Sequence, residues 1–146
     1  MATVRDLLQG KGHEVFTTAP DVSLQKALAL MAERHIGALP VTDEGRVVGI
    51  FSERDFARHA ASHSDCLDLQ VPVKELMSHP VYFVSPEQTV DECMTVMTAK
   101  KLRHLPVLEE GRLIGLVSIG DVVKSQLDEK QSTIEALEHF LWVNMI

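Results

Sequence analysis

The second half of this chain repeats the first half. When residues 13–58 are placed against residues 79–124, a shift of 66 positions aligns them without a gap, and thirteen of the 46 pairs are identical. The repeat includes ALPVTDEGRVVGIFSERD in the first copy and HLPVLEEGRLIGLVSIGD in the second. Such a chain is expected to fold as two similar units packed together, because one copy has too little apolar surface to close a core alone.

Each copy has the pattern of a strand, a helix, two strands and a second helix. In the first copy, EVFTTAP predicts a short strand that ends at Pro20, and SLQKALALMAERH predicts an amphipathic helix with Ser23 as its N-cap. ALPVTD and RVVGIFS predict two strands joined by a tight turn, in which Gly45 supplies a positive φ angle, and SERDFARHA opens the second helix. The prediction is an α/β (α+β) fold with two β-α-β-β-α repeats related by a pseudo-twofold axis, plus N-terminal and C-terminal helices.

The repeat and its flanks predict four segments. Residues 1–62 hold the first repeat and an N-terminal helix at TVRDLLQ, 63–72 are a linker, 73–127 hold the second repeat, and 128–146 form a C-terminal helix. VPVKELM is expected to be a short helix equivalent to TVRDLLQ. The C-terminal segment has Ser132 as its expected N-cap and carries Trp142 near its end. Its apolar residues are expected to pack on the same module, across a dimer or on a client protein.

Composition restricts the class of protein and its partners. The net charge of -7 argues against a non-specific nucleic-acid binder, which needs a basic face. The two cysteines, Cys66 and Cys93, suggest reduced thiols, and Cys93 aligns with an apolar helix position where a buried thiol is expected. No apolar run is long enough to span a bilayer or to serve as a signal peptide, so a cytoplasmic protein without membrane partners is expected.

Both copies place a serine and an aspartate at a junction between strand and helix. Ser52 and Asp55 stand at this junction in the first copy, and Ser118 and Asp121 stand there in the second. A helix N-terminus favours anions such as phosphate, and an ionised carboxylate can accept hydrogen bonds from both hydroxyls of a ribose. The simpler interpretation is a capping box, which the same spacing also fits. Capping and ligand binding are compatible.

The order Leu-Pro-Val, Glu-Gly-Arg, Gly-x-x-Ser-x-x-Asp and helix resembles the CBS domain. Two copies in tandem resemble a Bateman module, and the whole chain is similar to small stand-alone CBS-pair proteins. The resemblance covers roughly residues 1–127. It implies that adenine nucleotides or related adenosyl ligands bind in clefts between the repeats, and that the protein forms a homodimer.

The resemblance also implies which residues face each cleft. Arg103 and His104 are expected to reach the phosphate in the Asp121 cleft, which should therefore bind a phosphorylated nucleotide more tightly, and Arg54 is the cationic candidate in the Asp55 cleft. Packing of this type implies contributions from the opposite copy as well. The residues expected to wall the Asp121 cleft are Gly12, His13 and Ile36, and those expected to wall the Asp55 cleft are Ser78, His79 and Leu102. A structural role at a strand entry is the alternative for the two histidines.

Other chemistry is not expected. The sequence has no nucleophile elbow, no paired-histidine zinc motif and no P-loop, and no catalytic residue is predicted. His59, His63 and Cys66 have a spacing that can bind zinc, but they stand where a helix ends, a position that favours histidine without a metal. No metal site is predicted.

Two functions remain open. The first is a regulatory module that senses AMP, ADP, ATP or a related adenosyl ligand such as NAD and signals to a partner protein. The second is a dimeric scaffold that works without a ligand through its C-terminal helix.

Overall fold

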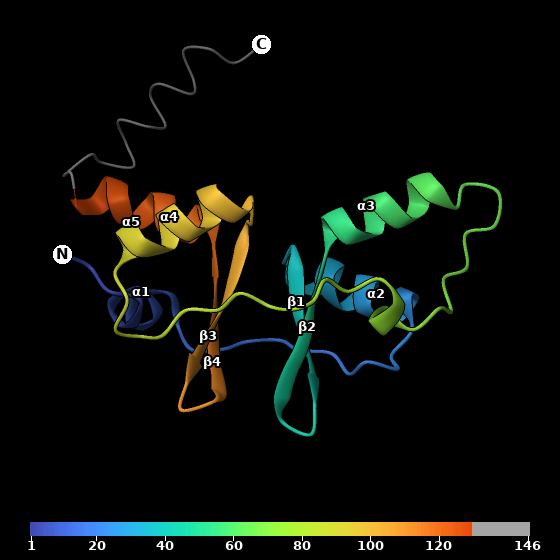
Figure 1. Cartoon of the computed structure of the whole chain (residues 1–146), viewed down its shortest axis with the longest axis horizontal. Coiled ribbons are helices and arrows are strands. Elements are labelled where there is room, and N and C mark those ends of the chain that lie inside the picture. Colours follow the sequence, from blue (N-terminus) through green and yellow to red (C-terminus); the bar gives the residue numbers. More distant parts are fainter. Residues whose placement is uncertain (130–146) are drawn as a thin grey trace, which may run out of the picture. The chain divides into compact units, whose positions relative to one another are not determined.

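A computed structural model describes residues 1–129 of the chain (Figure 1). These residues form five α-helices, one short 3₁₀ helix and four strands. In chain order they are α1 (Val4–Lys11), α2 (Leu24–Arg34), β1 (Ala38–Asp43), β2 (Arg46–Ser52), α3 (Glu53–Ser62), η1 (Val73–Glu75), α4 (Val90–Lys100), β3 (His104–Glu109), β4 (Arg112–Ser118) and α5 (Ile119–Glu129). Helix α4, strands β3 and β4 and helix α5 each start 66 residues after α2, β1, β2 and α3, so the sequence repeat is a structural repeat.

The described residues divide into two compact units that exchange their leading segments. One unit contains residues 1–13, 84–107 and those from 115 onward, and the other contains residues 14–83 and 108–114. In the first unit the backbone amide of Val4 donates to the carbonyl of Gln88 at 2.8 Å. In the second, the amide of Leu24 donates to the carbonyl of Val71 at 2.8 Å. The segment that precedes each copy is therefore bonded to the start of the first helix of the other copy.

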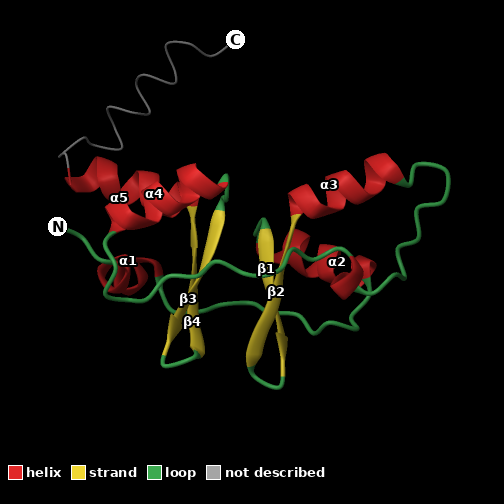
Figure 2. Ribbon diagram, in the orientation of Figure 1, coloured by secondary structure: helices red, strands yellow, loops and turns green. Residues whose placement is uncertain are grey.

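Each copy contains one antiparallel hairpin, drawn in yellow in Figure 2. The β1–β2 turn has Glu44 at φ 50° and Gly45 at φ 80°, and the β3–β4 turn has Glu110 at φ 52° and Gly111 at φ 78°. Two consecutive positive φ angles identify the tight turn whose twist matches that of paired strands. The predicted hairpin turn is confirmed in both copies.

Helix α2 begins and ends as its sequence predicts. Ser23 accepts a hydrogen bond from the Lys26 amide at 3.2 Å, which confirms the predicted N-cap, and His35 closes the helix in the left-handed region at φ 55°. Thr89 and Lys101 do the same for α4. Helices α4 and α5 lie side by side at one end of β3 and β4 (Figure 1).

The core of the second unit lies between α2 and the β1–β2 hairpin. Its fully buried side chains are those of Leu24, Ala27, Met31, Leu39, Val41, Phe51 and Val73. In the hairpin, Leu39 pairs with Phe51 and Val41 pairs with Gly49. A Cβ atom on Gly49 would lie 2.3 Å from the sulfur of Met77, so the glycine makes room for that side chain.

The predicted first strand of each copy is reduced to a single bridge. Thr18 pairs with Val41, and Val84 pairs with Val107, both in parallel. Proline explains why the ladder stops. The next bonds on either side of Thr18 would need the backbone N–H of Pro40 or of Pro20, and neither proline has one. Pro86 and Pro106 hold the same positions in the second copy.

Two other predicted helices differ in extent. VPVKELM forms only the single 3₁₀ turn η1, where TVRDLLQ forms the two turns of α1. Most of the predicted C-terminal helix 128–146, including Ser132 and Trp142, lies outside the described residues, and α5 itself continues to Glu129. No helix among residues 1–129 combines the length and the apolar character needed to cross a membrane.

Two valines in one hairpin provide a test of this core. Val41 is completely buried and Val48 is 36% exposed. We expect Val41→Ala to lower the free energy of unfolding by about 2 kcal/mol, because it removes two buried methyl groups and leaves a cavity. Val48→Ala should change it by less than about 0.5 kcal/mol. Urea unfolding of both variants measures the difference, and equal losses would contradict the assignment of the core.

The two cysteines should differ in reactivity. Cys93 is buried, as predicted, and burial raises the pKa of its thiol to about 11, so little thiolate is present at neutral pH. Cys66 is exposed. We expect a thiol reagent to modify Cys66 rapidly in the native protein and Cys93 only after unfolding. Fast modification of both thiols in native buffer would show that the α4 core is open.

Candidate functional site

Helices α3 and α5 both begin with a reciprocal capping box. In α3 the amide of Asp55 donates to the hydroxyl of Ser52 at 3.3 Å, and the amide of Ser52 donates to Oδ2 of Asp55 at 2.9 Å. In α5 the equivalent bonds join Asp121 to Ser118 at 3.1 Å and Ser118 to Oδ2 of Asp121 at 2.8 Å. Capping therefore accounts for one oxygen of each carboxylate. The contacts that each carboxylate makes beyond the capping box differ between the two copies.

Both oxygens of the Asp55 carboxylate accept hydrogen bonds from neutral hydroxyl groups. Its Oδ1 accepts a hydrogen bond from the hydroxyl of Ser78 at 2.8 Å, and its Oδ2 accepts a second bond from the hydroxyl of Ser52 at 3.0 Å. Asp55 is only 7% exposed, and Arg58 lies 3.9 Å from Oδ1 with a side chain that is 74% exposed. Ser78 is held there by its backbone, which exchanges two hydrogen bonds with Ile50 of β2. Both oxygens of Asp55 are thus engaged.

The Asp121 carboxylate is instead paired with a cation. The ammonium of Lys11 donates to Oδ2 of Asp121 at 2.6 Å and to the backbone carbonyl of Leu116 at 2.6 Å. Lys11 thus combines the two roles that Ser78 has in the other unit, where the Ser78 amide bonds to the Ile50 carbonyl and its hydroxyl bonds to Asp55.

The charge of Lys11 is reflected in the acidity of Asp121. Burial by itself raises the pKa of Asp121, but the hydrogen bond from Lys11, the bond from the Ser118 amide and the positive charge of Lys11 together outweigh burial. The pKa of Asp121 therefore lies below its ordinary value of 3.8. The carboxylate is ionised at neutral pH and its side chain is 23% exposed.

The sequence did not single out Lys11, although it did single out its neighbour Gly12. The repeat gives no signal for Lys11, because it lies in a stretch without a counterpart: Leu8 packs against Gly115 as Met77 packs against Gly49, and the stretch from there to the histidine is three residues longer in α1. Two features of the sequence are nonetheless consistent with its role: Lys11 is the basic residue in the last turn of α1, and it directly precedes the glycine that ends the helix at φ 104°.

The backbone just before β3 and just before β1 is hydrogen-bonded to the first residue of α5 and of α3. The carbonyl of Arg103 accepts a hydrogen bond from the Ile119 amide at 2.8 Å, and in the first copy the carbonyl of Gly37 accepts one from the Glu53 amide at 3.1 Å. The side chain of Arg103 is exposed and that of His104 is half-buried, and Arg54 is exposed in the first turn of α3. Their contact with a ligand stays a prediction.

Of the six residues predicted to wall a cleft from the opposite copy, four lie in the same unit as the carboxylate concerned and two do not. Gly12 and His13 belong to the unit of Asp121, and Ser78 and His79 belong to the unit of Asp55, where His79 is followed by a cis peptide bond to proline. Ile36 and Leu102 each belong to the unit that does not contain the carboxylate they are predicted to serve. Their roles stay predictions.

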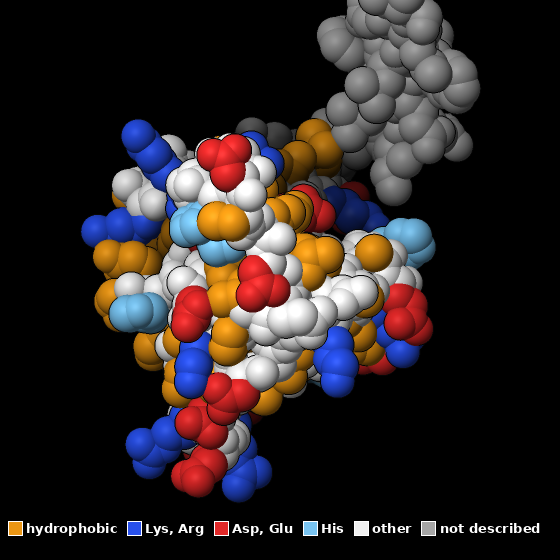
Figure 3. Space-filling model, turned by 90° about the vertical axis from the view of Figure 1, so that its right-hand side faces the viewer, with side chains coloured by type: hydrophobic (Ala, Val, Ile, Leu, Met, Phe, Trp, Pro, Cys, Tyr) orange, Lys and Arg blue, Asp and Glu red, His pale blue; other side chains and the backbone are white. Residues whose placement is uncertain are grey.

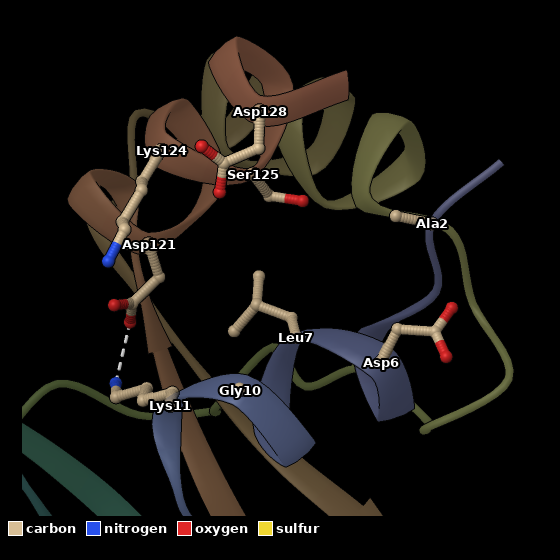
Figure 4. Close-up of a pocket in the computed structure, with 9 residues that line it drawn as sticks. All are labelled: Ala2, Asp6, Leu7, Gly10, Lys11, Asp121, Lys124, Ser125 and Asp128. Carbon is tan, nitrogen blue, oxygen red and sulfur yellow. Dashed lines mark hydrogen bonds and ion pairs between the residues drawn. The ribbon is translucent and has the colours of Figure 1, made fainter. Parts of the chain in front are cut away.

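A hollow lies beside each carboxylate, and the two hollows are equivalent in the repeat. Along the second helix, the lining residues that match at a shift of 66 are Asp121 and Asp55, Lys124 and Arg58, Ser125 and His59, and Asp128 and Ser62. The hollow at α5 has a volume of about 310 Å³ and the one at α3 about 340 Å³. Figure 4 shows the first, with Leu7 pointing into it and the Lys11–Asp121 pair at one end.

Charged side chains of both signs lie on the surface (Figure 3), and two histidines at the end of α3 stack on each other. Acidic and basic side chains are mixed over the face shown in Figure 3. The rings of His59 and His63 stack with centroids 4.3 Å apart, and Nδ1 of His63 is 3.0 Å from the carbonyl of His59. Among residues 1–129, histidine, cysteine and acidic side chains do not come together in groups of three or more that could hold a metal ion.

The lowered pKa of Asp121 predicts a dependence of stability on acid. A carboxyl whose pKa is lower in the folded state stabilises the fold above its ordinary pKa of 3.8, and this contribution is lost as the pH falls through the folded value. We expect the melting temperature of the wild type to fall more steeply below about pH 4 than that of Asp121→Asn. Lys11→Met should flatten the same part of the profile. Parallel profiles for all three proteins would contradict the importance of this ion pair.

Comparison with known proteins agrees with the repeat. The family model described as "CBS domain" matches residues 3–62 and 73–128. CBS domain-containing protein YhcV of Bacillus subtilis is 28% identical over 132 residues, which span 90% of this chain and 91% of that protein. The crystal structure of the CBS-domain containing protein ATU1752 from Agrobacterium tumefaciens is 43% identical, with a TM-score of 0.82 over 86% of this chain and 99% of the other.

A further similar structure contains a nucleotide. The crystal structure of CBSX2 in complex with AMP is 27% identical to this chain, with a TM-score of 0.70, and the match covers 89% of this chain and 99% of CBSX2. The family model covers both copies of the repeat, and the solved structures share the fold of the described residues. The chain belongs to the CBS domain family, as a pair of CBS domains in tandem.

Proposed function

We propose that this CBS pair is a regulatory module that binds an adenine nucleotide and signals to a partner protein. The ligand is AMP, ADP, ATP or a related adenosyl compound such as NAD. The observation that carries the proposal is the duplicated serine–aspartate pair at a helix N-terminus, each with a hollow beside its carboxylate. The AMP complex of the similar protein CBSX2 supports the class of ligand.

The chemistry of the two helix termini suits a ribose phosphate. A helix N-terminus carries partial positive charge that stabilises phosphate, and the carboxylate is an acceptor for the ribose hydroxyls. Within residues 1–129, the capping and Lys11 bonds to Asp121 both fall on Oδ2, so Oδ1 is the oxygen that a ribose would use. At Asp55 a ribose would have to replace the hydroxyl of Ser78 on Oδ1.

The two sites should differ in affinity for phosphate. Arg103 and His104 stand where the first copy has Gly37 and Ala38, so the Asp121 site has the additional cationic candidates and should bind a phosphorylated nucleotide more tightly. At the Asp55 site the cationic candidate is Arg54. The walls proposed from the opposite copy are Gly12, His13 and Ile36 for Asp121, and Ser78, His79 and Leu102 for Asp55.

The proposed output is regulation rather than catalysis. The hydroxyls of Ser52 and Ser118 accept hydrogen bonds from their capping amides, and the carboxylates beside them belong to two separate sites. A ligand can act on a partner only by binding two states of the module with different affinity. We propose a homodimer in the cytoplasm as the form that responds.

A dimeric scaffold is the second candidate. It is favoured by apolar side chains on α4 and α5 that remain exposed: Met94 is 38% exposed, Ile119 46% and Val123 47%. Such a surface is typical of a contact between proteins. In this alternative, nucleotide is irrelevant and the C-terminal segment, which lies outside the described residues, supplies the contact.

Calorimetric titration with AMP tests the proposal. We expect the wild type to bind AMP and Asp121→Asn to weaken that binding about 10- to 100-fold, because a neutral amide is a poorer acceptor for the ribose hydroxyls than a carboxylate. Asp55→Asn should have the smaller effect. A chain that lacks residues 131–146 should keep its affinity for AMP. If AMP, ATP and NAD all fail to bind the wild type while the truncated chain loses its dimer, the scaffold is the correct function.

A further inference from the structure

We propose that Lys11 sets the charge preference of the Asp121 site, so that this site selects phosphorylated adenosyl ligands over the uncharged nucleoside. The inference rests on the proposed function and adds to it a residue that neither the repeat nor the family pattern indicates. It also distinguishes the two sites by a single ammonium group.

The position of Lys11 is fixed by two hydrogen bonds. Its ammonium donates to Oδ2 of Asp121 and to the carbonyl of Leu116, both at 2.6 Å. Leu116 lies on β4 two residues before Ser118, and Lys11 lies in the last turn of α1, where a cation is favoured by the helix dipole. Two acceptors from different elements therefore hold the charge at the start of α5, although the side chain is 36% exposed.

The electrostatic consequence concerns phosphate. An ionised Asp121 in the first turn of α5 repels any anion that approaches the N-terminus of that helix and opposes the attraction of the helix dipole. Lys11 cancels this charge at 2.6 Å while leaving Oδ1 of the carboxylate to accept from a ribose. The site can then bind a sugar hydroxyl and a phosphate without repulsion between phosphate and carboxylate.

The first copy shows what the site is like without the lysine. Lys11 has no counterpart there: Met77 packs against Gly49 as Leu8 packs against Gly115, and the next residue, Ser78, makes the contacts with the carboxylate and with Ile50. Asp55 is closed by the neutral hydroxyl of Ser78, and its nearest cation, Arg58, is 3.9 Å away and largely exposed, so water screens it. The Asp55 site thus keeps more of its negative charge and should discriminate less in favour of phosphate.

The hollow beside the ion pair has room for the charged part of a ligand. Its volume is about 310 Å³, and its charged lining residues are Lys11 and Lys124 together with Asp6, Asp121 and Asp128 (Figure 4). A phosphate near Lys11 would be close to a second cation, Lys124 of α5, which lies at the same end of the hollow, whereas Asp6 lies at the other end (Figure 4). The Asp55 hollow has Arg58 and Leu76 where the first has Lys124 and Leu7, and it has the neutral Ser78 in place of Lys11.

The test compares AMP with adenosine in variants of the full chain. The background is Asp55→Asn, so that the titration reports mainly on the Asp121 site. In this background we expect AMP to bind more tightly than adenosine, and Lys11→Met to reduce the ratio of the two affinities about tenfold, with most of the loss on the AMP side. Lys11→Arg should restore the preference, because it returns the charge. Lys26→Met, which removes a lysine from α2 in the other unit, should leave the ratio unchanged.

The outcomes separate this inference from the function on which it rests. If the Asp55→Asn protein and the wild type bind no adenosyl ligand, the proposed function fails and the role of Lys11 fails with it. If AMP and adenosine bind but Lys11→Met leaves their ratio unchanged, the function stands and this inference is wrong. A tighter AMP complex in Lys11→Met would also overturn it, because Lys11 would then act as a competitor of the ribose. Circular dichroism of each variant checks that the fold is intact.

Discussion

The exchange of leading segments between the copies is the constraint on which the rest of the structure depends. Backbone bonds between residues 2–5 and 86–90, and between residues 69–74 and 20–25, attach each segment to the copy that does not follow it in sequence. This exchange places Lys11 beside Asp121 and Ser78 beside Asp55. Neither carboxylate would have its second set of contacts without it.

Much of the fold could be predicted because the signals are local and occur twice. The caps at Ser23 and Thr89, the turns at Gly45 and Gly111 and the capping aspartates each depend on residues within one turn of the chain. The matching of two copies turned weak local signals into strong ones. The first strands were overestimated because the effect of proline on a ladder depends on which partner strand it faces, and a single sequence does not give that register.

The site was predictable to the same extent. The carboxylates and their serines follow from the motif, and Ser78 follows from the expected packing of CBS pairs. Lys11 does not, because its partner Asp121 is 110 residues away and it lies between Leu8 and His13, in a stretch three residues longer than the matching one between Met77 and His79. A comparison of the two copies finds residues that both keep. It misses a residue that is present at only one of the two sites. Such a residue can give the two sites different ligand specificities although both sites derive from the same repeat.

The prolines that end each parallel bridge have one more consequence. A two-stranded hairpin has two open edges, and open edges invite pairing with strands of other molecules. Here the outer edge of β1 meets only Thr18 and that of β2 meets only Ser78, among the bridges to residues outside the strands. On that edge of β1, Pro40 lacks the amide that an incoming strand would need to extend the ladder. Pro40 and its counterpart Pro106 on β3 thus both shorten the sheet and protect the outer edge of each hairpin from pairing with strands of other molecules.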